Sequence, residues 1–471
     1  MTTAAQEGKQ KKVFLLLFLQ KKKNPYFLPL AVLLFALIIH APALNGFFAA
    51  DDFVWLRHNT WQDAARAVTG TWGIGTAFRP ITRASLVLSA QLYRWNDTPW
   101  HLENIILHAL NGILLAAVCR RAGMAAAASL AAGALFVAMP FDWENVDWIS
   151  GRTGLLCLTA MLTAIWCWHK GGPYLAAACA AQAVAIFCYE PGLILPAIIA
   201  ALAPVWHRTG IAPRTSLRRL AIITAAAALT WSVRAVALGT PGVALDMISP
   251  HPITEAARNL GRILFYIAPE AGPIGAAAAI ILLAAGLLNR TTRIPVAPLL
   301  AAAVIAYLPF IAVIGTTDRF VYLATAPLAV ACVVSARAVR WPRVLLAALF
   351  FAGCLSTLRQ AQHFAAAGDR TRLILDRAIA ASRGLPLSVF DHIPAQDGKY
   401  YLLRDKFADA IAARTGRPAA AVLTDDVLDT PALSARVQAQ PTAFFRFDPN
   451  SNGFIPITAQ AWRRANGVPA P

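Results

Sequence analysis

The first long apolar segment of the chain, residues 26–48, runs directly into two neighbouring carboxylates in the stretch FFAADDF, residues 47–53. Crossing a bilayer does not require this pair, because Asp51 and Asp52 repel each other and lose hydration energy close to lipid. Ionisable groups at a membrane face indicate a functional site by default, and the alternative is a solvated helix end with two chance acids. Asp51 and Asp52 are therefore the first candidate functional residues.

The composition is that of a polytopic membrane protein. Of the 471 residues, 58% are hydrophobic and 14% are charged, against about 25% charged in soluble domains, and the mean hydropathy is +0.54. The net charge of +18 could indicate nucleic-acid binding, but Lys and Arg lie mostly in short runs between apolar segments, where they set membrane topology. We therefore expect no nucleic-acid partner. The seven Cys residues show no metal-ligand spacing and are interpreted as small core residues.

Runs of Lys and Arg alternate with apolar segments that are long enough to cross a bilayer. Six lysines precede the first segment, so residues 1–25 are expected to form a basic cytoplasmic N-terminus. The sequence predicts an all-α polytopic membrane domain over 26–358, with about eleven spans and the C-terminus outside. The predicted spans are 26–48, 102–119, 123–141, 153–168, 173–188, 191–206, 220–240, 273–289, 295–315, 320–338 and 344–358.

Two outer loops are long enough to hold structure of their own. The first, residues 49–100, is expected to form short helices that lie in the membrane interface. The other, a Pro/Gly-rich loop after residue 240, is expected to end in another interfacial helix at 253–268. Arg234 is the main candidate for a charge inside the membrane.

Residues 360–471 are predicted to form a small soluble α+β domain on the outer side. A helix-like start at 361–382 is followed by strand-like runs near 387–393 and 443–447, and by an amphipathic helix near 399–415. The domain contains no Cys and no recognisable catalytic signature. It is therefore interpreted as a structural or acceptor-docking appendage.

The positive-inside rule, applied with Lys and Arg alone, places every acidic loop motif on the same outer face. Arginines there could bind the phosphate of a lipid whose tail stays in the bilayer, and a carboxylate could act as general base on an incoming hydroxyl. Arg152 and Arg319 have an alternative role, in which each snorkels or pairs with a nearby Asp. The groups assigned to this face are Asp51, Asp52, Arg79, Asp142, Glu144, Asp147, Arg152, Glu190, Asp318 and Arg319.

Two histidines, His101 and His108, are seven residues apart and so lie on one helical face. They are interpreted as packing residues, because a zinc site needs more convergent donors than this spacing supplies. Trp143 and Trp148 are interpreted as aromatic residues at the membrane interface.

Four fragments resemble motifs of the GT-C superfamily of membrane glycosyltransferases. The nearer resemblance is to transmembrane O-mannosyltransferases with luminal tetratricopeptide repeats and to their bacterial relatives, and it covers much of residues 45–340. Two departures are the Tyr189-Glu190 pair, where the family has Lys-Glu, and a C-terminal region without a tetratricopeptide period. The fragments are FRPIT at 78–82, HLENIILH at 101–108, PFDWENVDWISGR at 140–152 and DRFVYL at 318–323.

The resemblance implies an inverting transferase that moves a sugar from a polyprenyl-phosphate donor to a protein, lipid or glycan acceptor. Asp51 would be the base and Asp52 the alternative, and adjacent acids titrate as a coupled pair. The three arginines of the set would neutralise the departing phosphate. No metal site is assigned, because relatives differ in metal use, and a divalent cation stays open as a cofactor. The substrate-binding set is Arg79, His101, Glu144, Arg152, Glu190, Arg319 and Tyr322.

Two alternatives differ in class. A transporter or flippase of lipid-linked sugars would need charges or broken helices near the bilayer midplane, whereas most charges here lie at predicted helix ends. An inactive GT-C-like scaffold is the third interpretation. The Lys/Arg topology and the high Ala content favour a multi-pass protein of a bacterial inner membrane, with a periplasmic C-terminus.

Overall fold

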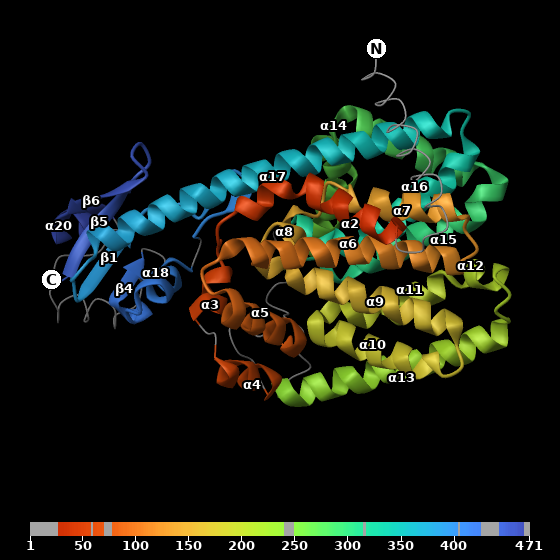
Figure 1. Ribbon diagram of the computed structural model, residues 1–471, viewed down its shortest axis with the longest axis horizontal. Helices are drawn as coiled ribbons and strands as arrows, with labels where there is room; N and C mark the ends of the chain where they lie inside the picture. The colour runs from red at the N-terminus through yellow and green to blue at the C-terminus, as the bar shows by residue number, and fades with distance from the viewer. Residues whose placement is uncertain are drawn as a thin grey trace, which may run out of the picture.

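The computed structural model describes residues 27–57, 60–69, 78–239, 249–313, 317–403, 406–424 and 442–465. It consists of a helical bundle and a small C-terminal domain, which one long helix, α17 (Pro342–Ala381), connects (Figure 1).

Eleven apolar helices of the described residues coincide with the eleven predicted spans. Five are long and apolar enough to cross a membrane, and six more are shorter. The chain is therefore a multi-pass membrane protein, and the predicted fold class is confirmed. The long helices are α6 (Asp97–Arg121), α9 (Arg152–Lys170), α13 (Pro213–Leu238), α15 (Arg290–Tyr307) and α17. The shorter ones are α2 (Phe27–Ile39), α7 (Ala126–Val137), α10 (Tyr174–Cys188), α11 (Leu195–Ala201) with the 3-10 turn Glu190–Ile194, the second part of α14 (Pro252–Leu288) and α16 (Tyr322–Ser335).

Helix α14 combines two predicted elements. Gly272 has a left-handed backbone conformation, with φ of 68°, and it interrupts the helix between the predicted interfacial segment 253–268 and the predicted span 273–289. Glycine adopts this conformation without steric cost, so the chain changes direction there.

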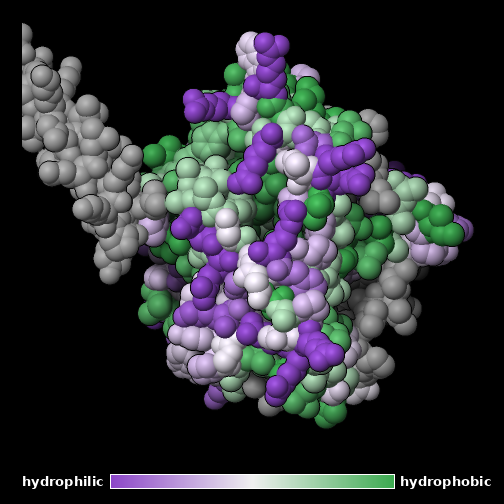
Figure 2. All heavy atoms as spheres, turned by 90° about the vertical axis from the view of Figure 1, so that its right-hand side faces the viewer, coloured by the Kyte–Doolittle hydropathy of each residue, from purple (hydrophilic) through white to green (hydrophobic). Residues whose placement is uncertain are grey.

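The basic loops gather at one end of the bundle, as the positive-inside rule requires. Figure 2 shows this end as a band of hydrophilic side chains bordered by apolar surface. Arg219 of α13 donates to the carbonyl oxygens of Trp168 and His169, so it ties the end of α9 to the start of α13. The exposed arginines of these loops include Arg120, Arg121, Arg208, Arg214, Arg218, Arg290, Arg293, Arg340 and Arg343.

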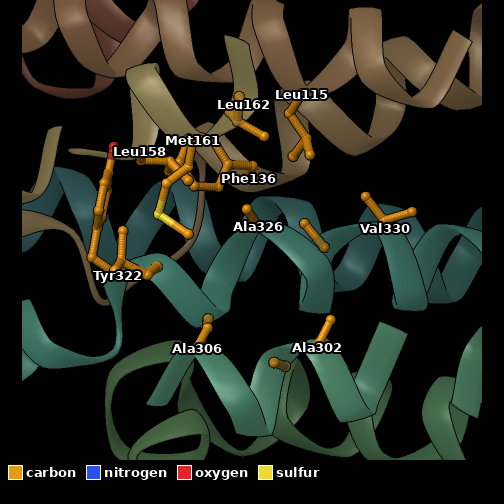
Figure 3. Packing of buried hydrophobic residues seen from close by; sticks show 14 of the residues in the cluster. Leu115, Phe136, Leu158, Met161, Leu162, Ala302, Ala306, Tyr322, Ala326 and Val330 are labelled. Carbon is orange, nitrogen blue, oxygen red and sulfur yellow. The ribbon is translucent and has the colours of Figure 1, made fainter. Parts of the chain in front are cut away.

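Small residues allow the helices to approach closely. Ala302 and Ala306 of α15 point toward α16, and Ala326 of α16 points toward Met161 of α9 (Figure 3). A Cβ atom added at Gly133 of α7 would collide with the carbonyl group of Gly112 on α6. Close backbone packing of this kind stabilises helix pairs in membranes, where the hydrophobic effect contributes little between helices.

The opposite end of the bundle carries the loop helices and faces the C-terminal domain (Figure 1). The described residues of the first outer loop contain three short helices, in agreement with the short helices expected for 49–100. They are α3 (Asp52–Arg57), α4 (Trp61–Thr69) and α5 (Pro80–Tyr93). The second outer loop in chain order, residues 138–151 between α7 and α9, forms the single turn α8 (Trp143–Val146) and a 3-10 turn at Ile149–Gly151.

The C-terminal domain is a mixed sheet with helices, as predicted. Strand β1 (Leu387–Asp391) is buried along its length and lies between two parallel neighbours. The order is β4 (Val422–Thr424), β1, β5 (Thr442–Asp448) and β6 (Gly453–Ile457), with β6 antiparallel to β5. Further elements are the pair β2 (Gln396–Asp397) and β3 (Tyr400–Tyr401), and the helices α18 (Phe407–Thr415) and α20 (Ala459–Ala465).

The boundary expected between residues 358 and 360 does not separate two helices. Helix α17 continues without interruption from the last apolar segment to Ala381, because the sequence between them contains no proline. The C-terminal domain is thus held by a rigid helix instead of a flexible linker.

Candidate functional site at the outer end

The stretch that carries Asp51 and Asp52 is a turn after the first span. Ala50 has a positive φ of 46°, and its backbone N–H donates to the carbonyl oxygen of Leu402 in the C-terminal domain at 2.7 Å. The turn is therefore held from outside the membrane bundle.

The two neighbouring acids have different surroundings. Asp52 is 1% exposed, and its carboxylate accepts from the backbone N–H of Ala49 at 3.0 Å and from the N–H and hydroxyl of Ser150 at 2.9 and 2.5 Å. Burial raises the pKa of Asp52 to about 7, although these hydrogen bonds lower it. Asp51 is partly exposed, and its charge interacts with that of Arg319. Asp52 therefore holds the second loop, while Asp51 is partly exposed and interacts electrostatically with Arg319.

Glu144 joins three parts of the chain. Its side chain is fully buried and accepts from the hydroxyl of Tyr401 at 2.6 Å and from the backbone N–H of Arg319 at 2.9 Å. The Arg319 side chain lies 3.6 Å from the same carboxylate and 5.6 Å from the centre of the Trp148 ring. Arg319 is thus held against the second outer loop by Glu144 and Trp148.

A second set of charges surrounds Glu190 at the start of its 3-10 turn. The Arg79 guanidinium group contacts this carboxylate at 2.9 Å and lies 4.6 Å from the centre of the Tyr189 ring. Arg234 reaches the same carboxylate at 3.3 Å, so this buried arginine near the outer end of α13 is paired. The pKa of Arg83 is lowered to about 10, first by burial and then by the charge of Arg79.

Arg79 and Arg319 belong to one electrostatic group. The charges of both act on Tyr189, and the two guanidinium groups repel each other. Their side chains are 31% and 29% exposed, so both reach the surface of the outer end. Two cations held together at a lipid-water boundary attract a phosphate group.

Arg152 has a different position from the other arginines. Its side chain is 2% exposed and contacts Glu103 at 2.8 Å, Asn104 at 2.9 Å and the Ser89 hydroxyl at 2.6 Å. These contacts join α5, α6 and α9 below the outer surface. Arg152 is therefore placed to hold helices together, and it does not share the exposed position of Arg79.

His101 and Tyr322 are both fully buried. The His101 ring packs against Phe364 of α17, with ring centres 5.7 Å apart. The Tyr322 hydroxyl lies 2.9 Å from Nδ1 of His108 and 3.1 Å from the Asn111 amide. These two candidate binding residues consequently lie in the interior, away from the exposed arginines.

The second outer loop also brings polar groups into the bundle. Three side chains that could bind a metal ion, His40, His108 and Asp142, have their ligand atoms within 4.8 Å of one another. His108 thus has the converging partners that its spacing from His101 did not supply, and His101 itself lies apart from them.

The interpretation of Trp143 and Trp148 as interface residues is wrong. They are 3% and 1% exposed and lie beneath the β2–β3 pair, where Trp148 packs against Tyr401. Their indole N–H groups donate to Asp318 at 2.5 Å and to the Ala49 carbonyl at 3.1 Å. Both rings are covered by the C-terminal domain, which the sequence pattern does not indicate.

Several residues at this end were not candidates from the sequence. Lys399 contacts Asp318 at 3.1 Å, and Tyr401 and Ser150 contact Glu144 and Asp52 as described. His40 follows directly after the first apolar helix. A polar residue at the end of an apolar span is the one sequence signal that could have made His40 a candidate.

Comparison with known proteins identifies the fold. No protein-family model matches the sequence, and no curated protein matches it. ArnT from Cupriavidus metallidurans, solved bound to undecaprenyl phosphate, is similar with a TM-score of 0.50 and 13% identity, over 90% of this chain and 93% of that chain.

Two further solved structures are similar over most of this chain. Archaeoglobus fulgidus oligosaccharyltransferase, tethered to an acceptor peptide, has a TM-score of 0.47 and 12% identity, over 85% of this chain and 64% of its own. The mycobacterial arabinofuranosyltransferase AftD has a TM-score of 0.48 and 16% identity, over 83% of this chain and 32% of its own. The structure thus defines the chain as a multi-pass helical membrane protein with a charged outer end. Its fold is similar to that of ArnT over nearly the whole of both chains, and this agrees with the fold expected from the four sequence fragments.

Proposed function

We propose that this protein is an inverting glycosyltransferase. It moves a sugar from a polyprenyl-phosphate donor to an acceptor hydroxyl at the outer, periplasmic face of a bacterial inner membrane. The observation that carries the proposal is the grouping of Asp51, Arg79 and Arg319 at one end of a GT-C fold, where the first outer loop supplies Asp51 and Arg79 and the turn before α16 supplies Arg319.

The two arginines suit the donor phosphate. Each is held by a glutamate, Arg79 by Glu190 and Arg319 by Glu144, so neither side chain has to be ordered when the donor binds. Guanidinium groups fixed in this way stabilise charge that develops as a phosphate leaves. The neighbouring apolar helices provide a surface for the lipid chain, which stays in the bilayer.

Asp51 is the proposed base. It would accept the proton of the acceptor hydroxyl while the hydroxyl oxygen attacks the anomeric carbon and the bond from that carbon to the phosphate oxygen breaks. The polyprenyl phosphate departs with the bonding electrons, next to Arg79 and Arg319. Asp52 is less suited to this role, because it is buried and its oxygens are already occupied by Ala49 and Ser150.

The remaining predicted site residues take supporting roles in this proposal. Glu144 and Glu190 orient the two arginines, and Arg152 holds α9 against α5 and α6. His101 and Tyr322 act from the interior and are not proposed to touch the donor. The acceptor is a protein, lipid or glycan, and the docked C-terminal domain borders the path by which it would approach.

The test uses the purified full chain in liposomes with a panel of labelled undecaprenyl-phosphate hexoses and pentoses. Membranes from a host strain that lacks the protein supply acceptors. We expect transfer of label from at least one donor to a non-polyprenyl product, with release of undecaprenyl phosphate. A labelled donor that crosses the bilayer intact, without covalent transfer, would instead identify a flippase and contradict the proposal.

A further inference from the structure

We propose that His40, His108 and Asp142 form a buried zinc site that fixes the second outer loop to the bundle. The three residues come from different parts of the chain: His40 follows α2, His108 lies on α6 and Asp142 precedes α8. The site is separate from the proposed donor site and does not depend on the proposed function.

The distances between the three ligand atoms suit a small cation. Nε2 of His108 lies 3.0 Å from Asp142 Oδ2, and Nε2 of His40 lies 3.9 Å from the same oxygen. Ligands about 2.0–2.1 Å from a tetrahedral zinc ion are separated from one another by about 3.3 Å. A small movement of the His40 ring would therefore complete the geometry.

Both imidazole rings are oriented by a partner on the nitrogen that faces away from the site. Nδ1 of His40 lies 2.7 Å from Asp147, and Nδ1 of His108 lies 2.9 Å from the Tyr322 hydroxyl. Metal-binding histidines characteristically use the second nitrogen in this way, which leaves the Nε2 lone pair directed at the ion. Asp147, His40 and the proposed ion thus form a carboxylate–histidine–metal arrangement.

Nε2 of His108 lies 3.3 Å from the carbonyl oxygen of Val137, and the other atoms directed at the proposed ion lack hydrogen-bond partners among the described residues. They are Nε2 of His40 and both carboxylate oxygens of Asp142, in side chains no more than 2% exposed. Buried polar atoms without partners are costly, and in native proteins they usually contact water or an ion. Three such atoms around one position indicate that an ion binds there.

The charges of the group also match a dication. Among the described residues, no Lys or Arg lies within 4.0 Å of Asp142 or Asp147, and only His40 and His108 face them. Two buried carboxylates opposite neutral imidazoles would carry a net charge of about −2, and a divalent ion neutralises both. Imidazole nitrogens favour zinc over magnesium or calcium, which bind oxygen ligands.

The proposed role of the site is to position the loop. Asp142 stands two residues before Glu144, which holds Arg319, and Asp147 stands three residues before Ser150, which holds Asp52. A metal ion at His40 and His108 would therefore fix both ends of this loop relative to α2 and α6. Its loss is expected to loosen the outer end and to lower thermal stability.

The first test is the metal content of the purified full chain. After dialysis with zinc and removal of excess, we expect about one zinc ion per chain, bound by two imidazoles in X-ray absorption spectra at the usual zinc–nitrogen distance of about 2.0–2.1 Å. A chain that retains no zinc, or that binds it without imidazole ligands, would overturn the proposal. The polar group would then be a hydrogen-bonded network.

Variants locate the ion. His40→Ala and Asp142→Asn should lose the bound zinc, and Asp147→Asn should weaken zinc binding by about 10–100-fold, because Asp147 orients His40. His101→Gln is the matched control, since His101 is equally buried and lies on α6, the helix of His108, but is outside the group. Zinc that persists in His40→Ala and Asp142→Asn, measured on folded protein, would contradict the assignment. If these variants fail to fold, the zinc content and the X-ray absorption spectrum of the unaltered chain decide whether the zinc site exists.

Discussion

Two adjacent aspartates differ in environment because the turn that carries them points their side chains in different directions. Asp52 is buried against Ser150, whereas Asp51 is partly exposed and interacts electrostatically with Arg319. The sequence identifies the pair but cannot rank its members, because the partners of each lie about a hundred residues or more away in the chain. The ranking depends on the folding of the second outer loop and of the turn at Arg319.

Asp52 should make stability depend on pH. Its pKa is about 7 in the folded protein, against 3.8 for an unperturbed Asp side chain, so the folded state binds the extra proton between these pH values. This contribution to the free energy of unfolding therefore decreases as pH rises from about 4 to about 7. Thermal unfolding should show a difference between native protein and Asp52→Asn that favours the native protein more at pH 5 than at pH 8. A difference that grows toward pH 8 would contradict the raised pKa.

Arg79 should contribute mainly to binding the lipid phosphate. Arg79→Gln removes a charge-assisted hydrogen-bond donor worth about 1.5–3 kcal/mol, so undecaprenyl phosphate should bind about ten-fold or more weakly. Arg293→Gln, at the basic end of the bundle, is the control and should bind normally. Equal affinities for the Arg79→Gln and Arg293→Gln proteins would remove Arg79 from the donor site.

At the scale of single elements, apolar segments bounded by Lys and Arg predicted all eleven apolar helices. Hydropathy and charge act locally, and in a bilayer each span satisfies its own backbone hydrogen bonds, so local sequence is sufficient. Hydropathy falls after residue 358, whereas helical structure continues across this position to Ala381. Leaving the membrane does not by itself end a helix.

The crossing of α6 and α7 requires glycine. Gly133→Leu would press a side chain against the Gly112 backbone, and we expect a loss of about 1–3 kcal/mol in the free energy of unfolding. Ala127→Leu on the exposed side of the same helix is the control and should leave stability almost unchanged. Thermal unfolding in detergent compares the two. Similar melting temperatures would show that α6 and α7 do not pack as closely as described.

At the scale of the whole molecule, the C-terminal domain is part of the outer end. The carbonyl oxygen of Leu402 holds the Ala50 turn, Tyr401 holds Glu144 and Lys399 holds Asp318. No local pattern predicts these contacts, because they join residues separated by about 80 to 350 positions. The sequence therefore indicated an appendage, and its docking on the outer face became evident only from the structure.

The contribution of the C-terminal domain to the outer end can be measured with a variant of Tyr401. Tyr401→Phe removes a hydrogen bond to a buried carboxylate, which should cost about 1–3 kcal/mol of stability and lower transfer activity by displacing Glu144 and Arg319. Tyr174→Phe, at the basic end, is the matched control. Unchanged stability and activity in Tyr401→Phe would show that the domain does not support the site.

The most direct test of the transferase site is single-turnover sugar transfer by Asp51→Asn, compared with the native protein and its best labelled undecaprenyl-phosphate sugar. Loss of a general base predicts a decrease of about 100-fold or more in the transfer rate, with binding of undecaprenyl phosphate retained through Arg79 and Arg319. Transfer by Asp51→Asn at the native rate would contradict the assignment of Asp51 as the base and the proposed arrangement of the site.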